Sequence, residues 1–262
     1  MNLSVSNIGW NFSDDEIIYS FLQDQSFFGL EIAPSRFFPD APYDHCDEAA
    51  QISEKLKQKY HLQICSMQSI WYGKTQKIIE SESARKDLFS YTKKAIKFAV
   101  SVGCRNLVFG CPKNREIVDC NDKKIIENFL VDISDLALQN NVIIAFEANP
   151  TIYHTNFVNT TNEAIEMIKK LHHPALKINL DVSTIIENRE SLSIISDNID
   201  LINHVHISEP YLKPLKRRKL HEELKIILED NGYYNFVSLE MGKTEDIKSL
   251  YDSIIYMKEV FS

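Results

Sequence analysis

Four short apolar segments in the second half of the chain each carry a polar side chain of a type that binds metal ions. These side chains are Glu147, Asp181, His206 and Glu240. Burying such groups among apolar residues costs several kcal/mol unless a partner compensates them. Three carboxylates that meet at one place repel one another unless a divalent cation lies between them. An oxygen-rich set with one imidazole suits Mn²⁺, Mg²⁺ or Co²⁺ as well as Zn²⁺. The residue types therefore indicate a site for one divalent metal ion.

The segments that carry these residues have the length and apolar character of β-strands. Eight such segments recur along the chain, and each is followed by a longer amphipathic stretch that has helix-start signals. They are Leu3–Ile8, Phe28–Ala33, Leu62–Met67, Asn106–Gly110, Val142–Glu147, Leu176–Asp181, Ile202–Ser208 and Phe236–Met241. Their starts recur at roughly 33-residue intervals, which fits one strand, one helix and two short loops.

This alternation predicts an α/β fold with a parallel sheet and right-handed crossovers. Eight evenly spaced units without a linker favour a closed (β/α)₈ TIM barrel that spans residues 1–262 as a single domain. The alternative is an open doubly wound sheet, which usually shows a glycine fingerprint after the first strand. The chain has only 7 glycines and lacks that fingerprint. In a barrel, the four candidate ligands would point inward at the carboxyl ends of consecutive strands.

Several helix boundaries are also visible in the sequence. Ser13 to Glu16 and Thr160 to Glu163 each place a hydroxyl three residues before a glutamate, which predicts two capping boxes. Apolar residues at helical spacing predict a helix over 84–102 that ends at Gly103. A last helix is expected over 244–261.

The composition excludes several classes of protein. With 37 acidic and 29 basic residues, the net charge is −8, which disfavours a nucleic-acid partner. No apolar stretch has the length needed to span a bilayer, and no signal peptide is visible. The five cysteines are odd in number and lack CxxC spacing, which is typical of reduced thiols. We therefore expect a cytoplasmic protein that binds neither nucleic acid nor membrane.

The strand-end motifs resemble a known superfamily. The segments Phe-Glu147-Ala-Asn149-Pro, Leu-Asp181, His204-Val-His206-Ile-Ser-Glu209 and Ser-Leu-Glu240-Met are similar to those of the sugar phosphate isomerase/epimerase superfamily. These xylose isomerase-like TIM barrels include ketose 3-epimerases, hydroxypyruvate isomerase and inosose dehydratase. The resemblance implies that Glu147, Asp181, His206 and Glu240 bind one divalent metal, with Mn²⁺ favoured, and that no organic cofactor is needed. It also implies that Glu147 and Glu240 act as acid and base in a homodimer or homotetramer.

The chemistry that follows is proton abstraction next to a carbonyl group. A metal that chelates two neighbouring oxygens of a hydroxy-ketone acidifies the C–H between them and stabilises the enediolate. Return of the proton by a second carboxylate would make the protein an isomerase or epimerase of a sugar or sugar derivative. Loss of a β-hydroxyl would make it a dehydratase of inosose or dehydroshikimate type. The sequence leaves both outcomes open, and His204, on the same side of its strand as His206, is expected to support that ligand.

Two further alternatives are less favoured. An endonuclease IV-like DNA repair enzyme has the same barrel but binds three zinc ions. That site requires additional histidines, which the early strands and Thr184 do not supply. A non-catalytic barrel that binds a ligand or protein is the last alternative.

The surroundings of the metal site differ from those of ketose 3-epimerases. Thr184 stands where they commonly carry a substrate-contacting histidine, and Leu212 stands where they carry an arginine. The glycine-rich loop after the seventh strand is missing, so the pocket is expected to be rebuilt for another carbohydrate. The basic run 216–219 precedes a helix start, which suits a phosphate or carboxylate on the substrate. The candidate substrate contacts are Trp71, Asn149, His154, Glu209 and His221. Trp71 could instead serve in packing.

Overall fold

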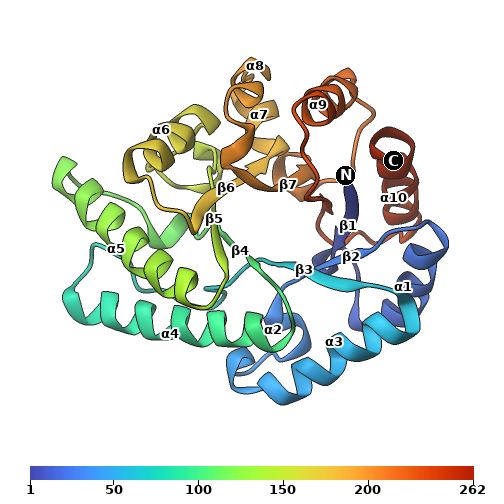
Figure 1. The fold of residues 1–262 in the computed structure, drawn as a ribbon, viewed down its shortest axis with the longest axis horizontal. Helices are drawn as coiled ribbons and strands as arrows, with labels where there is room; N and C mark the ends of the chain where they lie inside the picture. The colour runs from blue at the N-terminus through green and yellow to red at the C-terminus, as the bar shows by residue number, and fades with distance from the viewer.

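A computed structural model describes residues 1–262 and shows a closed barrel of eight parallel strands in chain order (Figure 1). The first strand pairs with both the second and the eighth, which closes the sheet. The strands are β1 (Asn2–Ser6), β2 (Gly29–Ile32), β3 (Gln63–Met67), β4 (Asn106–Phe109), β5 (Ile143–Glu147), β6 (Leu176–Asp181), β7 (Ile202–Ser208) and β8 (Phe236–Glu240). All eight predicted strands are confirmed within two residues, and the open-sheet alternative is excluded.

Helices surround the barrel on its outside (Figure 1). The α-helices are α1 (Asp15–Asp24), α2 (Pro34–Phe37), α3 (Cys46–Tyr60), α4 (Glu82–Ser101), α5 (Cys120–Gln139), α6 (Thr161–Leu171), α7 (Val182–Asn188), α8 (Ser193–Ser196), α9 (Lys219–Asp230) and α10 (Lys248–Phe261). Short 3₁₀ turns occur at Asn7–Gly9, Phe12–Asp14, Pro42–Asp44, Pro112–Asn114, Thr151–Tyr153, Ile199–Leu201 and Pro210–Leu212. No helix combines the length and the apolar character that a bilayer span requires.

One of the two predicted capping boxes is present. Thr160 accepts a hydrogen bond from the backbone N–H of Glu163, whose carboxylate accepts one from the backbone N–H of Thr160. The prediction for Ser13 is wrong, because a 3₁₀ turn over residues 12–14 moves the start of α1 to Asp15. Ser13 therefore lies inside that turn, and its hydroxyl donates to the side chain of Asp14 instead.

The long fourth helix follows the prediction closely. The hydroxyl of Ser81 accepts a hydrogen bond from the backbone N–H of Ala84 and caps the helix, which begins at Glu82. At the other end, Gly103 has a φ of +73°, a left-handed conformation that glycine adopts without a steric penalty. The last helix starts four residues later than expected, at Lys248.

The barrel is irregular between β3 and β4. These strands pair only through Met67 and Leu107, whereas other neighbouring strands pair at three or more positions. Their amino-terminal parts are therefore not joined as a ladder, although the carboxyl ends, where a TIM barrel carries its functional groups, remain closed.

Candidate metal centre

Four consecutive strands bring the predicted ligands to the same end of the barrel. Glu147, Asp181 and Glu240 are the last residues of β5, β6 and β8, and His206 lies two residues before the end of β7. Asp181 is paired with His206 in the sheet, and Ser208 is paired with Glu240. The strand register therefore places the side chains at similar depth.

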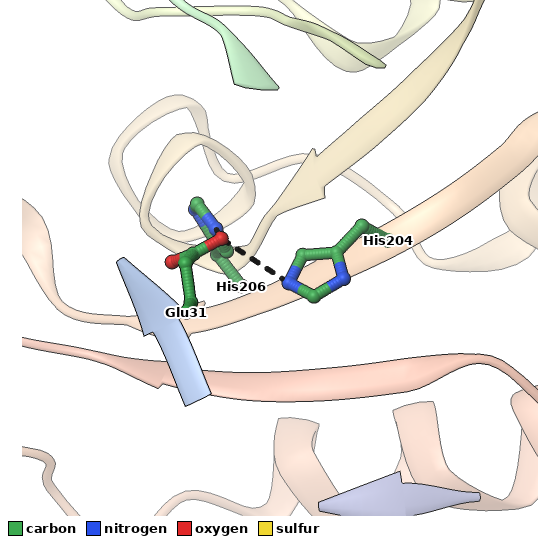
Figure 2. A group of neighbouring side chains, drawn as sticks. All are labelled: Glu31, His204 and His206. Carbon is green, nitrogen blue, oxygen red and sulfur yellow. Dashed lines mark hydrogen bonds and ion pairs between the residues drawn. The ribbon is translucent and has the colours of Figure 1, made fainter. Parts of the chain in front are cut away.

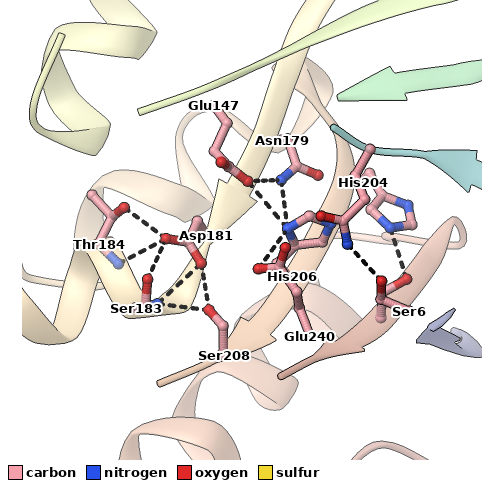
Figure 3. Close-up of polar contacts among 12 residues, drawn as sticks. Ser6, Glu147, Asn179, Asp181, Ser183, Thr184, His204, His206, Ser208 and Glu240 are labelled. Carbon is pink, nitrogen blue, oxygen red and sulfur yellow. Dashed lines mark hydrogen bonds and ion pairs between the residues drawn. The ribbon is translucent and has the colours of Figure 1, made fainter. Parts of the chain in front are cut away.

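Two of these carboxylates, Glu147 and Glu240, approach the Nδ1 atom of His206 (Figure 3). Glu147 Oε1 lies 3.1 Å from this nitrogen, and Glu240 Oε2 lies 3.3 Å from it. Ligand atoms of Asp181, His206 and Glu240 all lie within 4.8 Å of one another. Two atoms on opposite sides of one ion are about 4.4 Å apart when each bond is about 2.2 Å long. Asp181, His206 and Glu240 are thus compact enough to share one cation, and Glu147 reaches this group through its 3.1 Å contact with His206 Nδ1.

The orientation of His206 is set by a buried carboxylate behind it. Its Nε2 lies 2.9 Å from Glu31 Oε2, and both side chains are fully buried. A carboxylate accepts a hydrogen bond, so Nε2 donates its proton to Glu31 while Nδ1 faces the other carboxylates. Histidines that bind metals are commonly held by a carboxylate in this manner. His204 approaches the same Glu31 oxygen at 3.3 Å, which agrees with its expected supporting role (Figure 2).

The electrostatics of this cluster show a shortage of positive charge. Burial and the nearby Glu147 raise the pKa of Asp181, and burial raises the pKa of Glu240. Burial lowers the pKa of His206, but the charges of Glu31 and Glu240 outweigh this and hold it well above its ordinary value. The carboxylates therefore resist ionisation, and the imidazole beside them retains its proton. A divalent cation bound among these side chains would stabilise the ionised carboxylates. The residues present therefore fit a metal ion.

Asp181 is held in place by the start of the helix that follows it. Its carboxylate accepts hydrogen bonds from the backbone N–H groups of Ser183 and Thr184, at 3.2 and 3.0 Å. The hydroxyls of Ser183, Thr184 and Ser208 also contact it. Thr184 Oγ1 lies 2.8 Å from Asp181 Oδ2 and 3.0 Å from the carbonyl oxygen of Ala148. Thr184 is therefore engaged with the candidate ligand Asp181 rather than with the pocket.

Glu147 is positioned by a buried arginine that acts through an asparagine. Asn149 Nδ2 donates to Glu147 Oε2 at 2.9 Å, and Asn179 Nδ2 donates to Glu147 Oε1 at 2.7 Å. Arg115 Nη2 donates to Asn149 Oδ1 at 2.8 Å, which fixes the amide so that its NH₂ group faces Glu147. Arg115 is fully buried and also donates to the carbonyl oxygens of Gly110 and Glu147.

The residues predicted to contact substrate differ in their environments. Trp71 is buried, donates from Nε1 to Thr92 Oγ1 at 2.9 Å, and packs edge-on against Phe109. This contact is the packing alternative that the sequence left open. Asn149 contacts Glu147 as described above, whereas His154 is exposed on the loop after β5.

The last two predicted contacts are Glu209, on the connection between β7 and α9, and His221, in the first turn of α9. Glu209 is buried and accepts two hydrogen bonds from the guanidinium of Arg218, at 2.7 and 2.5 Å. His221 is buried, and its Nδ1 lies 3.1 Å from the hydroxyl of Tyr256. Both side chains are engaged within the protein, and the substrate contacts of all five residues stay predictions.

Arg115 and Tyr153 are among the residues near the site that were not found from the sequence. Arg115 follows a Pro-Lys-Asn turn, and nothing in that segment distinguishes it from a surface arginine. Tyr153 follows β5, and its hydroxyl accepts a hydrogen bond from the backbone N–H of Tyr211 at 3.0 Å. Burial, together with the charges of Asp181 and Glu240, raises the pKa of Tyr153. The only available signal for Tyr153 was its place after a predicted barrel strand.

Comparison with known proteins gives a family match over most of the chain. A family model described as xylose isomerase-like TIM barrel matches residues 26–259. No curated protein matches the chain.

Solved structures with similar folds include proteins of different activities. The structure of D-psicose 3-epimerase with D-tagatose from Clostridium cellulolyticum H10 has a TM-score of 0.80 at 15% identity, and the match covers 100% of both chains. The probable 3-DHS dehydratase involved in petrobactin synthesis, from Bacillus anthracis, has a TM-score of 0.72 at 17% identity over 98% of both chains. A family 2 AP endonuclease from Brucella melitensis has a TM-score of 0.77 at 18% identity over 99% of both chains. At these identities the likeness shows the fold alone.

Proposed function

Because the chain belongs to the xylose isomerase-like TIM barrel family, we propose that it is a metal-dependent isomerase or epimerase of a sugar or sugar derivative. The observation that carries this proposal is the convergence of carboxylates on His206 Nδ1, with Glu147 at 3.1 Å and Glu240 at 3.3 Å. These residues and Asp181 would hold one divalent ion, for which Mn²⁺ is our first choice because the set is rich in oxygen.

The bound ion would polarise two neighbouring oxygens of a hydroxy-ketone and thereby acidify the C–H bond between them. The protein's own part is to hold two carboxylates at the reacting carbon. Glu147 and Glu240 come from strands β5 and β8, so they reach the centre from different sides of the barrel mouth (Figure 3). One carboxylate takes the proton from carbon, and the other returns a proton to the same or the neighbouring carbon.

The proposal is tested by proton exchange with solvent. Purified protein with Mn²⁺ is incubated with a panel of ketoses in deuterated water, and incorporation of deuterium next to the carbonyl is followed by NMR. We expect exchange that a chelator abolishes and that Mn²⁺ restores. Exchange that persists in fully metal-stripped protein would contradict the proposal.

A matched pair of variants tests the role of Glu240. Glu240→Gln is expected to retain the fold and to lose at least about 10²-fold in exchange rate, the usual contribution of a positioned acid or base. Glu245→Gln, which removes an exposed carboxylate five residues later, should leave the rate unchanged. Equal rates for both variants would remove Glu240 from the mechanism.

A dehydratase is the second candidate, and the position of Tyr153 favours it. Its phenol lies near Asp181 and Glu240, and a phenol is protonated at neutral pH. A neutral hydroxyl at this place suits the protonation of a departing β-hydroxyl group. Incubation with cyclitols and with dehydroshikimate, followed by ultraviolet detection of the unsaturated product, separates the two candidates. Product formed by the natural chain and lost in Tyr153→Phe would establish the dehydratase.

A further inference from the structure

The amino-terminal end of the barrel, opposite the metal centre, contains a cavity of about 460 Å³. It opens where β3 and β4 are joined only through Met67 and Leu107. Most of its polar lining comes from the starts of strands and the turns before them: Gln63, Arg105, Asn141, Asn203, His204 and Asn235. Barrels are usually filled by branched apolar side chains at this level, so a polar cavity is unusual here.

The barrel layer next to the cavity is polar as well. Ser4, Ser66 and Ser238 are buried inside the barrel, together with Asn106. Asn106 Nδ2 donates to Ser66 Oγ at 2.9 Å, and Asn203 Nδ2 donates to Asn106 Oδ1 at 2.6 Å. This network connects the rim of the cavity with the barrel interior through hydrogen bonds rather than apolar packing.

The charge of the cavity is opposite to that of the whole protein. The chain has 37 acidic residues and a net charge of −8, but no carboxylate lines the cavity. Arg105 is the only permanently charged residue in the lining, and its exposed guanidinium forms no ion pair. A cavity that combines one cation with several amides is complementary to a small polar anion.

His204 supplies a hydrogen-bonding nitrogen at the base of the cavity. It is 1% exposed, and its Nε2 lies 2.8 Å from Ser238 Oγ and 3.3 Å from Glu31 Oε2. Its Nδ1, on the other side of the ring, makes no hydrogen bond within the protein, and this atom is not sealed from solvent. This nitrogen is therefore free to hydrogen-bond a ligand in the cavity.

We propose that this cavity is a second binding site, which takes a small anion that carries hydroxyl groups. Arg105 would pair with the phosphate or carboxylate group, while His204 Nδ1 and the amides would bond the hydroxyls. Occupancy is linked to the metal centre, because His204 and His206 contact the same oxygen of Glu31, at 3.3 and 2.9 Å. The binding site stands independently of the proposed function, and only the link to the metal rests on it.

Calorimetric titration with glycerol 3-phosphate tests the site, and glycerol serves as the uncharged probe. We expect the natural chain to bind glycerol 3-phosphate at one site per chain, whether or not Mn²⁺ is present, and to bind glycerol at least tenfold more weakly. Arg105→Gln removes the cation, and Asn235→Asp adds a carboxylate without changing the size of the side chain. Each variant is expected to lose at least tenfold in affinity for glycerol 3-phosphate. The control Lys123→Gln removes an exposed cation at the start of α5, at the opposite end of the barrel, and should bind as the natural chain does.

The link to the metal centre is tested by titration of Mn²⁺ with and without saturating glycerol 3-phosphate. Binding linkage is reciprocal, so the Mn²⁺ affinity should change by the same factor as the anion affinity, at least threefold, and Arg105→Gln should abolish the change. Anion affinity that is equal in the natural chain and Arg105→Gln would overturn the site. Anion binding without any change in Mn²⁺ affinity would overturn the link. A chain that binds the anion but no Mn²⁺ would refute the proposed function and leave the second site intact.

Discussion

Gly110 shows how closely the residues around the candidate metal centre are fitted to Glu147. It follows β4, and a Cβ atom built on it would lie 2.9 Å from Glu147 Oε2. A Cβ atom essentially never makes a contact this short, so the carboxylate would have to move. Glu147 is also held by Asn149 and Asn179, and a shift would break the hydrogen bonds that orient it. Glycine is needed here for space, not for backbone conformation.

We therefore expect Gly110→Ala to lower the rate of proton exchange by about 10- to 100-fold, because misplacing a reacting group by about 1 Å has effects of this size. The rate with saturating substrate and Mn²⁺ is the measurement, and circular dichroism checks the fold. Gly9→Ala is the matched control, since its Cβ would make only ordinary contacts of 3.4 to 3.6 Å. If both variants keep full activity, the position of Glu147 is less critical than the geometry indicates.

At the scale of the elements, the two segments with a capping-box sequence, which begin at Ser13 and Thr160, form different structures. Thr160 closes the start of α6 through reciprocal hydrogen bonds with Glu163. Ser13 has the same sequence pattern but lies in a 3₁₀ turn, where its hydroxyl bonds no helical N–H group. The pattern alone does not distinguish them, because the 3₁₀ turn shifts the start of the first helix.

Thr160→Ala is expected to lower the free energy of unfolding by about 1 kcal/mol, the usual effect of losing an N-cap side chain. Ser13→Ala should change it by less than about 0.5 kcal/mol, as is usual for surface sites without such a role. Urea denaturation of the two variants beside the natural chain measures both values. Equal losses would mean that Ser13 also caps its helix in solution.

The connection between β7 and α9 passes over the barrel mouth. Tyr211 and Leu212 both have positive φ, at 64° and 53°, conformations that side chains other than glycine adopt at a cost. Buried Glu209 holds the connection by accepting hydrogen bonds from Arg218 and from the backbone N–H of Lys216. The Leu212 carbonyl also accepts a hydrogen bond from the N–H of Gly242, which ties the connection to the end of β8.

At the scale of the whole molecule, His221 makes stability depend on pH. It lies in the first turn of α9, with its ring against Tyr256 and Phe261 of α10. Burial lowers the pKa of His221 from 6.5 to about 4, although Glu209 acts in the opposite direction. As the pH falls below 6.5, the unfolded chain binds a proton at this residue that the folded protein does not accept until about pH 4. The contribution of His221 to stability is therefore complete above pH 6.5 and is lost as the pH falls toward 4.

The free energy of unfolding of the natural chain is expected to fall between pH 7.5 and pH 4 by about 3 kcal/mol more than that of His221→Phe. This difference follows from the difference between the pKa of His221 in the folded and the unfolded chain. Urea denaturation at several pH values gives this difference. His61→Gln, which replaces an exposed histidine, should keep the pH dependence of the natural chain. A His221→Phe variant with unchanged pH dependence would show that His221 titrates normally in the folded protein.

The sequence by itself determined the barrel and the placement of the candidate ligands. Strand periodicity, helix signals and spacing are local properties, so the strands were predicted within two residues and the four candidate ligands were placed at their carboxyl ends. The same local reasoning placed His204 on the side of His206, because alternate residues of a strand share a face. It failed at Ser13, where two local structures compete for the same residues.

Only the tertiary structure decided how the other side chains meet. Arg115 reaches Asn149 across 34 residues, and Glu31 reaches His206 across 175. Trp71 turns to Thr92 in the core, and Thr184 turns back to Asp181. The cavity beneath His204 depends on how β3 and β4 diverge. Such contacts depend on distances between segments that close packing brings together, and no local pattern of residues contains those distances.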